Sequence, residues 1–189
     1  MSSHHIIREK QEPALLVLGL DSFDDEQLGQ LLEWSPTLIV TPLIAEKLNS
    51  YGIKIDWVIT DEIDEALQSD INLLPLGDHT IIASALNYLI AQGYPAVNIV
   101  ADEFDLNDYL PFADKINLVI FYDQQKIYAV NPGFSKWKPA GEGIRLLQHP
   151  ANIKTSGLQK ISNDNFKTMA DGFFELHFDN SCIFIAEAL

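Results

Sequence analysis

Residues 14–20 read ALLVLGL, a run that contains six apolar side chains and one glycine. A short apolar run without alternation is typical of a strand that is buried on both faces of a parallel sheet. Two further runs of this kind follow along the chain, TLIVT at 37–41 and AVNIV at 96–100. Strands buried on both faces need helices to cover them, so these runs predict an α/β fold.

Segments with helical periodicity separate the apolar runs. One predicted helix follows residue 41 and ends near Gly52. Another covers residues 80–92, and Asp78 precedes it as the expected N-cap. Short strands are expected at 56–60 and 72–76. This alternation of strands and helices indicates a doubly wound, mostly parallel sheet.

The pattern changes after about residue 115. Five strand-like segments follow one another with no helical pattern between them: 117–122, 126–130, 141–148, 173–178 and 182–186. The first two predict a hairpin around Asp123, and the last two predict a second hairpin around Asp179. We therefore expect an α/β, nucleotide-binding-like domain over residues 1–115 and an antiparallel β-sandwich domain over residues 116–189.

Composition excludes several classes of function. The 189 residues include 27 acidic and 12 basic side chains, which gives a formal net charge of −15. This charge repels nucleic acid and anionic membranes, so we expect neither as a partner. The sequence shows neither a membrane-spanning apolar run nor a secretory signal, and its single cysteine, Cys182, lies in an apolar segment. We therefore expect a cytoplasmic protein.

The loops after the predicted strands carry partial motifs. Residues 55–64 read IDWVITDEID, residues 77–81 read GDHTI, and residues 101–106 read ADEFDL. Trp137 and the segment TSGL at 155–158 follow in the C-terminal half. This order of elements and motifs resembles the thiamin pyrophosphokinase family over most of the chain. In that family an α/β domain precedes a β-sandwich.

The resemblance implies ATP-dependent transfer of a pyrophosphoryl group to thiamin, with Mg²⁺ and ATP as cofactors. It implies catalytic roles for Asp61, Asp78 and Asp105. It also implies that Asp61 and Asp78 hold the metal and that Thr80 contacts the cofactor. Finally it implies a homodimer whose interface is formed by the C-terminal domain. Apolar residues on both faces of the last two predicted strands favour the same interface.

The motifs also depart from the family's pattern. A pair of glycines that lets backbone N–H groups approach a nucleotide is replaced by Pro42 and Leu43. Two positions that are acidic in the family are occupied by Ile63 and Ile81. These departures favour an alternative function, a catalytically silent homodimer that binds a small ligand or a partner on the same fold. Whether the chain is an enzyme stays open between the two hypotheses.

Six aspartates fall in or next to the loops at the carboxyl ends of the predicted strands: Asp21, Asp61, Asp64, Asp78, Asp102 and Asp105. Because these strand ends share one edge of the sheet, we expect a cleft there. Carboxylates that converge in a cleft repel one another and favour binding of Mg²⁺ or Ca²⁺. Alternatively the acids point into solvent or cap helices, as Asp105 is placed to do for residues 106–112.

Overall fold

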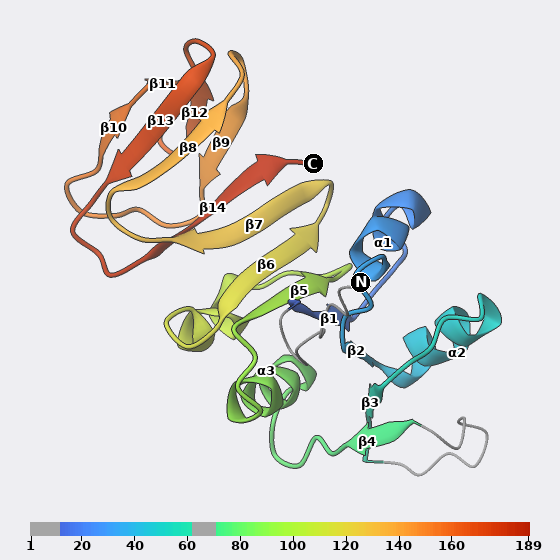
Figure 1. Ribbon diagram of the computed structural model, residues 1–189. Coiled ribbons are helices and arrows are strands. Elements are labelled where there is room, and N and C mark those ends of the chain that lie inside the picture. Colours follow the sequence, from blue (N-terminus) through green and yellow to red (C-terminus); the bar gives the residue numbers. More distant parts are fainter. Residues whose placement is uncertain (1–11, 62–70) are drawn as a thin grey trace, which may run out of the picture.

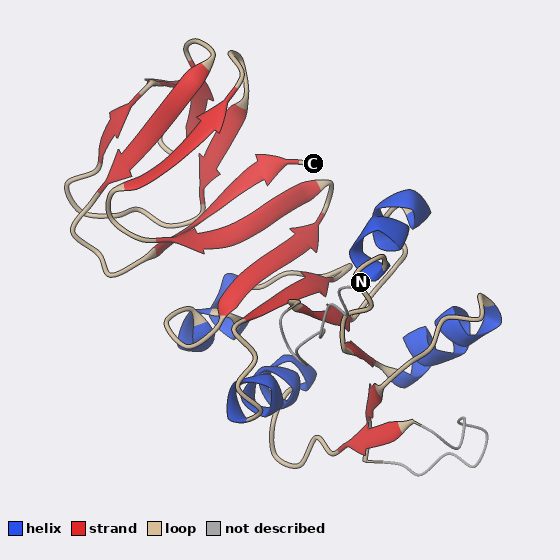
Figure 2. Ribbon diagram, in the orientation of Figure 1, coloured by secondary structure: helices blue, strands red, loops and turns tan. Residues whose placement is uncertain are grey.

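The computed structural model describes residues 12–61 and 71–189. Their strands form a sheet of eleven strands and a second sheet of three, which faces one end of the first (Figure 1). The longer helices lie in the N-terminal half, and the C-terminal half is built of strands (Figure 2). No helix within the described ranges is long and apolar enough to cross a membrane.

The N-terminal half alternates strands and helices, as the sequence predicts. Its elements are β1 (Ala14–Val17), α1 (Asp25–Leu32), β2 (Leu38–Val40), α2 (Pro42–Ser50), β3 (Trp57–Ile59), β4 (Asn72–Leu74), α3 (Ile81–Ala91) and β5 (Ala96–Val100). The strands pair in parallel in the order β5-β1-β2-β3-β4. The chain therefore proceeds from β1 to β4 in one direction and then returns to place β5 on the other side of β1.

Two hydrophobic cores explain the apolar run that opens the sheet. Leu15 and Val17 pack in a core with residues of α1 and α2, whereas Ala14 and Leu16 pack in a core with residues of α3. Consecutive side chains of a strand point to opposite faces of its sheet. All four residues of β1 are therefore buried, each at 1% exposure or less.

The start of α3 differs from the prediction. Thr80 is its N-cap, and the Thr80 hydroxyl accepts a hydrogen bond from the Ala83 N–H at 3.2 Å. Asp78 instead lies in a turn that is closed by a hydrogen bond from His79 N–H to Leu76 O. The prediction of Asp78 as the N-cap is therefore wrong by two residues, because the turn keeps it ahead of the helix.

The C-terminal half begins with two short 3₁₀ helices and continues as strands. These elements are η1 (Leu106–Asp108), η2 (Leu110–Phe112), β6 (Asn117–Tyr122), β7 (Gln125–Val130), β8 (Phe134–Lys138), β9 (Gly143–Leu146), β10 (Lys154–Ser156), β11 (Leu158–Lys160), β12 (Asn165–Thr168), β13 (Gly172–His177) and β14 (Ile183–Ala188). β6 and β7 form the predicted hairpin. Its turn residues Asp123 and Gln124 have positive φ angles of 48° and 57°, as a two-residue turn of type I′ requires.

The prediction of a second hairpin is wrong. β13 pairs with β8 and β10 in the three-stranded sheet, whereas β14 pairs with β7 and β9 in the large sheet. The two strands face each other across the sandwich core, where Phe174 and Leu176 of β13 meet Ile183 and Ile185 of β14. The chain between them passes from one layer to the other.

The large sheet continues across the predicted domain boundary. β5 and β6 lie on either side of residues 115 and 116, and they pair in parallel along five residues. Antiparallel pairing begins with β7. The fold class is confirmed: a doubly wound, mostly parallel sheet is followed by an antiparallel β-sandwich. The division into two domains stays a prediction.

Candidate functional site

A cleft of about 560 Å³ lies at the carboxyl edge of the sheet, beside the point where the strand order reverses between β1 and β5. The loops after β1, β2 and β5 line it, together with the first turn of α3. In open α/β sheets ligands bind in such crevices. The prediction that this edge forms a cleft is therefore confirmed.

Acidic residues make up nearly half of the lining of the cleft. Five of the lining residues are acidic: Asp21, Asp102, Glu103, Asp105 and Asp108. None of the described residues that line it is a lysine or an arginine. Phe104 adds an aromatic ring that is stacked with those of Tyr109 and Tyr122. We call this site the acidic cleft.

Asp102 holds the loop after β1 in place. Its Oδ1 accepts hydrogen bonds from the Asp21 N–H at 3.0 Å, the Ser22 N–H at 3.1 Å and the Ser22 hydroxyl at 3.1 Å. Burial acts to raise the pKa of Asp102, but these hydrogen bonds outweigh it, so the pKa lies below its ordinary value. Asp102 is thus an anchored carboxylate rather than a free ligand.

Gly19 provides the space that Asp102 needs. A β-carbon at position 19 would lie 2.1 Å from Oδ2 and 2.5 Å from Cγ of Asp102. Any larger residue would therefore displace the carboxylate from the loop that it holds. The sequence showed this glycine only as an interruption of the first apolar run, and the contact between β1 and the end of β5 could not be inferred from it.

Asp61 and Asp78 do not line the acidic cleft. Asp61 follows β3, and its Oδ1 accepts hydrogen bonds from the N–H groups of Leu76 at 2.8 Å and Gly77 at 3.4 Å. Asp78 is exposed and directly follows Gly77 in the sequence. The Asp61 carboxylate after β3 thus binds the backbone of the turn after β4, and this turn contains Asp78.

Asp105 lines the acidic cleft and also caps a helix. Its Oδ1 accepts hydrogen bonds from the backbone N–H and the side-chain amide of Asn107, both at 2.9 Å. The prediction that Asp105 caps the segment after it is confirmed. Thr80 is likewise engaged as the N-cap of α3, so the hydroxyl that the resemblance assigns to a cofactor has a structural partner.

The metal assignment to Asp61 and Asp78 stays a prediction. Within residues 12–61 and 71–189, no group of three or more His, Cys, Asp and Glu side chains is arranged to hold a metal ion. A Mg²⁺ ion that also binds substrate phosphates needs only one or two carboxylates. Asp64, which was also expected at this edge of the sheet, lies outside the described residues.

The residues around the cleft do not fit an ATP–Mg²⁺ site. Pro42 opens α2 and offers no N–H, and the Leu43 side chain is 75% exposed beside it. Lys47 is the lysine nearest to Pro42 and Leu43 in the sequence, and its ammonium is engaged in a hydrogen bond to Leu20 O at 3.4 Å. Phosphates in the cleft would meet five acidic residues without a basic side chain from its lining.

Solved structures with the same arrangement identify the fold. Thiamin pyrophosphokinase from Geobacillus thermodenitrificans matches with a TM-score of 0.70 over 93% of this chain and 97% of its own, at 13% identity. A protein from Lactobacillus plantarum matches with a TM-score of 0.69 over 94% and 98%, at 14% identity. The fold is that of thiamin pyrophosphokinases. The Candida albicans enzyme matches as well, with a TM-score of 0.66 over 94% and 89%, at 10% identity.

The thiamin pyrophosphokinase fold therefore extends over nearly the whole chain, and the resemblance inferred from partial motifs is confirmed at this level. Comparison of sequences without structure does not detect this similarity. No protein-family profile matches the chain, and no curated protein is similar enough in sequence to match.

Proposed function

We propose that this chain is a thiamin pyrophosphokinase-like protein without pyrophosphokinase activity, and that its acidic cleft binds a small, positively charged ligand. The lining of the cleft carries the proposal. Five acidic residues surround a space of about 560 Å³, a volume suited to a small molecule. An organic cation gains from attraction to the carboxylates and from apolar contact with Phe104.

The same lining opposes pyrophosphoryl transfer. That reaction depends mainly on positioning and on cations that neutralise the phosphates. Two like charges several ångströms apart near a protein surface repel by about 1 kcal/mol or more, and the phosphates would face several carboxylates. Pro42 further removes a backbone N–H from the loop where the family places glycines.

The fold itself favours a second candidate, which is the family's own activity. In that case Mg²⁺ and ATP are the cofactors, Asp61 and Asp78 hold the metal, and Asp105 assists from the neighbouring loop. Thr80 contacts the cofactor. The match over 93% of the chain to thiamin pyrophosphokinase supports this candidate, and the cleft lining supports the first.

Calorimetry distinguishes the two candidates. Thiamin, whose thiazolium ring is cationic, should bind the wild-type chain, whereas ATP–Mg²⁺ should give no heat of binding. Asp108→Asn removes a carboxylate from the cleft lining and should weaken thiamin binding. Asp114→Asn removes an exposed carboxylate outside the lining and should leave it unchanged. Binding of ATP–Mg²⁺ to the wild type, or equal thiamin binding by both variants, would refute the proposal.

We also propose that the chain is a homodimer that associates through the outer face of the three-stranded sheet. Trp137 of β8 and Phe173 of β13 are paired in register, and they are 54% and 67% exposed. Met169, 64% exposed, follows β12. β14 does not require a partner, because the chain itself covers both of its faces. A cytoplasmic location is part of the same proposal.

A further inference from the structure

The net negative charge of the chain comes from its N-terminal part. Residues 1–115 include 20 acidic and five basic side chains, whereas residues 116–189 include seven of each. The C-terminal part is therefore close to neutral as a whole. An anion repelled by the acidic cleft is not repelled to the same extent there.

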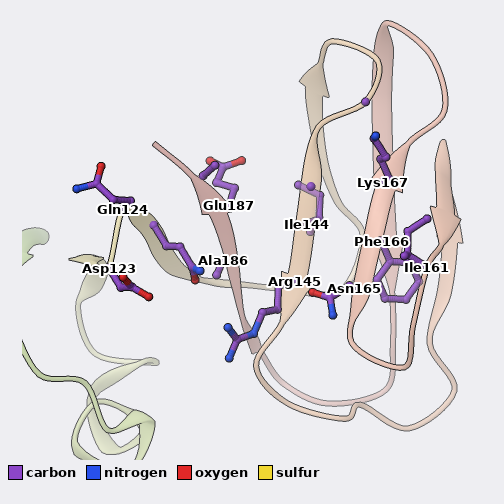
Figure 3. Close-up of a pocket in the computed structure, with 14 residues that line it drawn as sticks. Asp123, Gln124, Ile144, Arg145, Ile161, Asn165, Phe166, Lys167, Ala186 and Glu187 are labelled. Atoms are coloured by element: carbon purple, nitrogen blue, oxygen red, sulfur yellow. The ribbon is translucent and has the colours of Figure 1, made fainter.

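A second groove, of about 660 Å³, lies on the C-terminal part of the large sheet. It runs from the β6–β7 turn across β14 and β9 to β12 (Figure 3). Its polar side chains include Arg145 of β9, Asn165 and Lys167 of β12, and Gln125 of β7. We call this site the β9–β12 groove.

Strand register places the polar side chains on one face of the sheet. Arg145 is paired with Asn165 on one side and with Ala186 on the other. Lys167 is paired with Gly143, two residues before Arg145. Paired residues share a face, as do residues two apart along a strand. The small residues at 143 and 186 leave space between the longer side chains.

The two cations of the groove have no acidic partner. Neither the Arg145 guanidinium nor the Lys167 ammonium lies within 4.0 Å of a carboxylate oxygen of the described residues. Lys136 and Lys138 contrast with them, because both form ion pairs with the Glu187 carboxylate. The groove therefore presents positive charge that the rest of the described chain does not neutralise.

Two acidic residues also line the groove, and neither forms an ion pair with Arg145 or Lys167. Glu187 is held by its two lysines, and its side chain is only 4% exposed. Asp123 lies in the exposed turn at one end of the groove. In Figure 3 the Arg145 side chain extends from β9 toward the side on which this turn lies.

We propose that the β9–β12 groove binds a small ligand through a phosphate or carboxylate group. Arg145 supplies a planar pair of N–H donors that matches two oxygens of such a group. Lys167 adds a second positive charge farther along the groove, beside Gly141. The Asn165 side-chain amide donates one hydrogen bond to the Ser162 hydroxyl at 2.9 Å and keeps a second N–H beside Arg145. The site is separate from the acidic cleft and takes a ligand of opposite charge, so it does not depend on the function proposed for that cleft.

The test uses defined anions on the full chain. Calorimetry at low ionic strength with inorganic phosphate, pyrophosphate and citrate should show saturable binding of at least one, and the preferred probe distinguishes a phosphate ligand from a carboxylate ligand. Arg145→Gln should weaken that binding about tenfold or more, the effect of losing one charged, bidentate contact. Lys167→Gln should weaken it less, because this ammonium lies farther along the groove, beside Gly141, and acts on the anion at longer range.

Two variants control for net charge. Lys54→Gln removes an exposed cation in the loop before β3, far along the chain from the groove, and should bind the anion as the wild type does. Asp123→Asn removes the groove's exposed acid and should tighten binding severalfold. Equal binding by the Arg145 and Lys54 variants, or no binding of any probe, would overturn the proposal. So would an Arg145→Gln variant that alters only the oligomeric state, since the groove would then contact a second copy.

Discussion

Replacement of Asp102 by asparagine tests how the acidic cleft is built. The carboxylate accepts hydrogen bonds from two backbone N–H groups and one hydroxyl of the loop after β1. An asparagine in its place keeps one acceptor oxygen and turns an N–H donor toward other donors. Hydrogen bonds to a charged group contribute about 1.5–3 kcal/mol when buried. Because Asp102 is partly exposed, we expect a loss of about 1–2 kcal/mol.

Thermal unfolding followed by circular dichroism measures this loss. For a chain of this length, 1 kcal/mol corresponds to a shift of about 2–4 °C in Tm, so Asp102→Asn should unfold about 2–8 °C below the wild type at pH 7. The folded-state pKa of Asp102 lies below its ordinary value of 3.8. The contribution of the Asp102 carboxylate to stability is therefore present above pH 3.8 and is lost as the pH falls through the folded-state pKa.

Asp108→Asn is the matched control. It removes a carboxylate from the same cleft, but the Asp108 side chain accepts no hydrogen bond within the described ranges. Its Tm should lie within about 1 °C of the wild type, as is usual for a surface substitution. If the Asp102 and Asp108 variants unfold at the same temperature, the carboxylate does not hold the loop and this account of the cleft is wrong.

Three further predictions concern the rest of the fold. Thr80→Ala should destabilise the chain by about 1 kcal/mol through loss of the N-cap of α3, whereas Asp78→Ala should change its Tm by less than about 1 °C. Glu187→Gln should cost about 2 kcal/mol at pH 7, since it leaves two lysines without their carboxylate. Burial acts to raise the pKa of Glu187, but the two lysines outweigh burial and hold this pKa below its ordinary value of 4.5. In chemical denaturation, the difference in unfolding free energy between the wild type and Glu187→Gln should therefore shrink as the pH falls below that value. Phe173→Glu should convert a particle of twice 21.2 kDa into a monomer in light scattering, and Leu43→Glu, which changes an equally exposed apolar residue on α2, should not.

The parallel part of the fold is largely encoded in local sequence. Residues 14–20 are apolar without a charged or polar side chain because helices cover both faces of β1, whereas a strand with one face in water would alternate apolar and polar residues. The turn at Asp123 and Gln124 is similarly local, since two residues connect strands that pair directly with each other. The positions of β1 to β7 therefore follow from patterns within short windows.

The sandwich is less predictable, because its strands pair with distant partners. β13 and β14 are adjacent in sequence and apolar, yet they belong to different sheets. β8 alternates partly buried and exposed residues and lies between glycine- and proline-containing segments, so its sequence does not distinguish it from a loop. Strand pairing of this kind depends on contacts across the whole C-terminal half.

The residues of the candidate sites could likewise be predicted only where local sequence determines their position. The sequence placed Asp21, Asp102 and Asp105 at the carboxyl edge, and all three line the cleft. It could not show that Asp102 is anchored to the loop after β1. It also could not place Arg145 and Lys167 on one face of the sheet, since this depends on the register of β9 and β12.

A turnover assay with ATP–Mg²⁺ and thiamin tests the claim that this chain lacks pyrophosphokinase activity. The acidic cleft has no basic lining residue in the described part of the chain, and its neighbouring loop begins with Pro42. We therefore predict that formation of thiamin diphosphate equals that of a blank without protein. Product that accumulates with the wild type and disappears with Asp61→Asn would contradict the claim, and it would show that the chain is an active thiamin pyrophosphokinase.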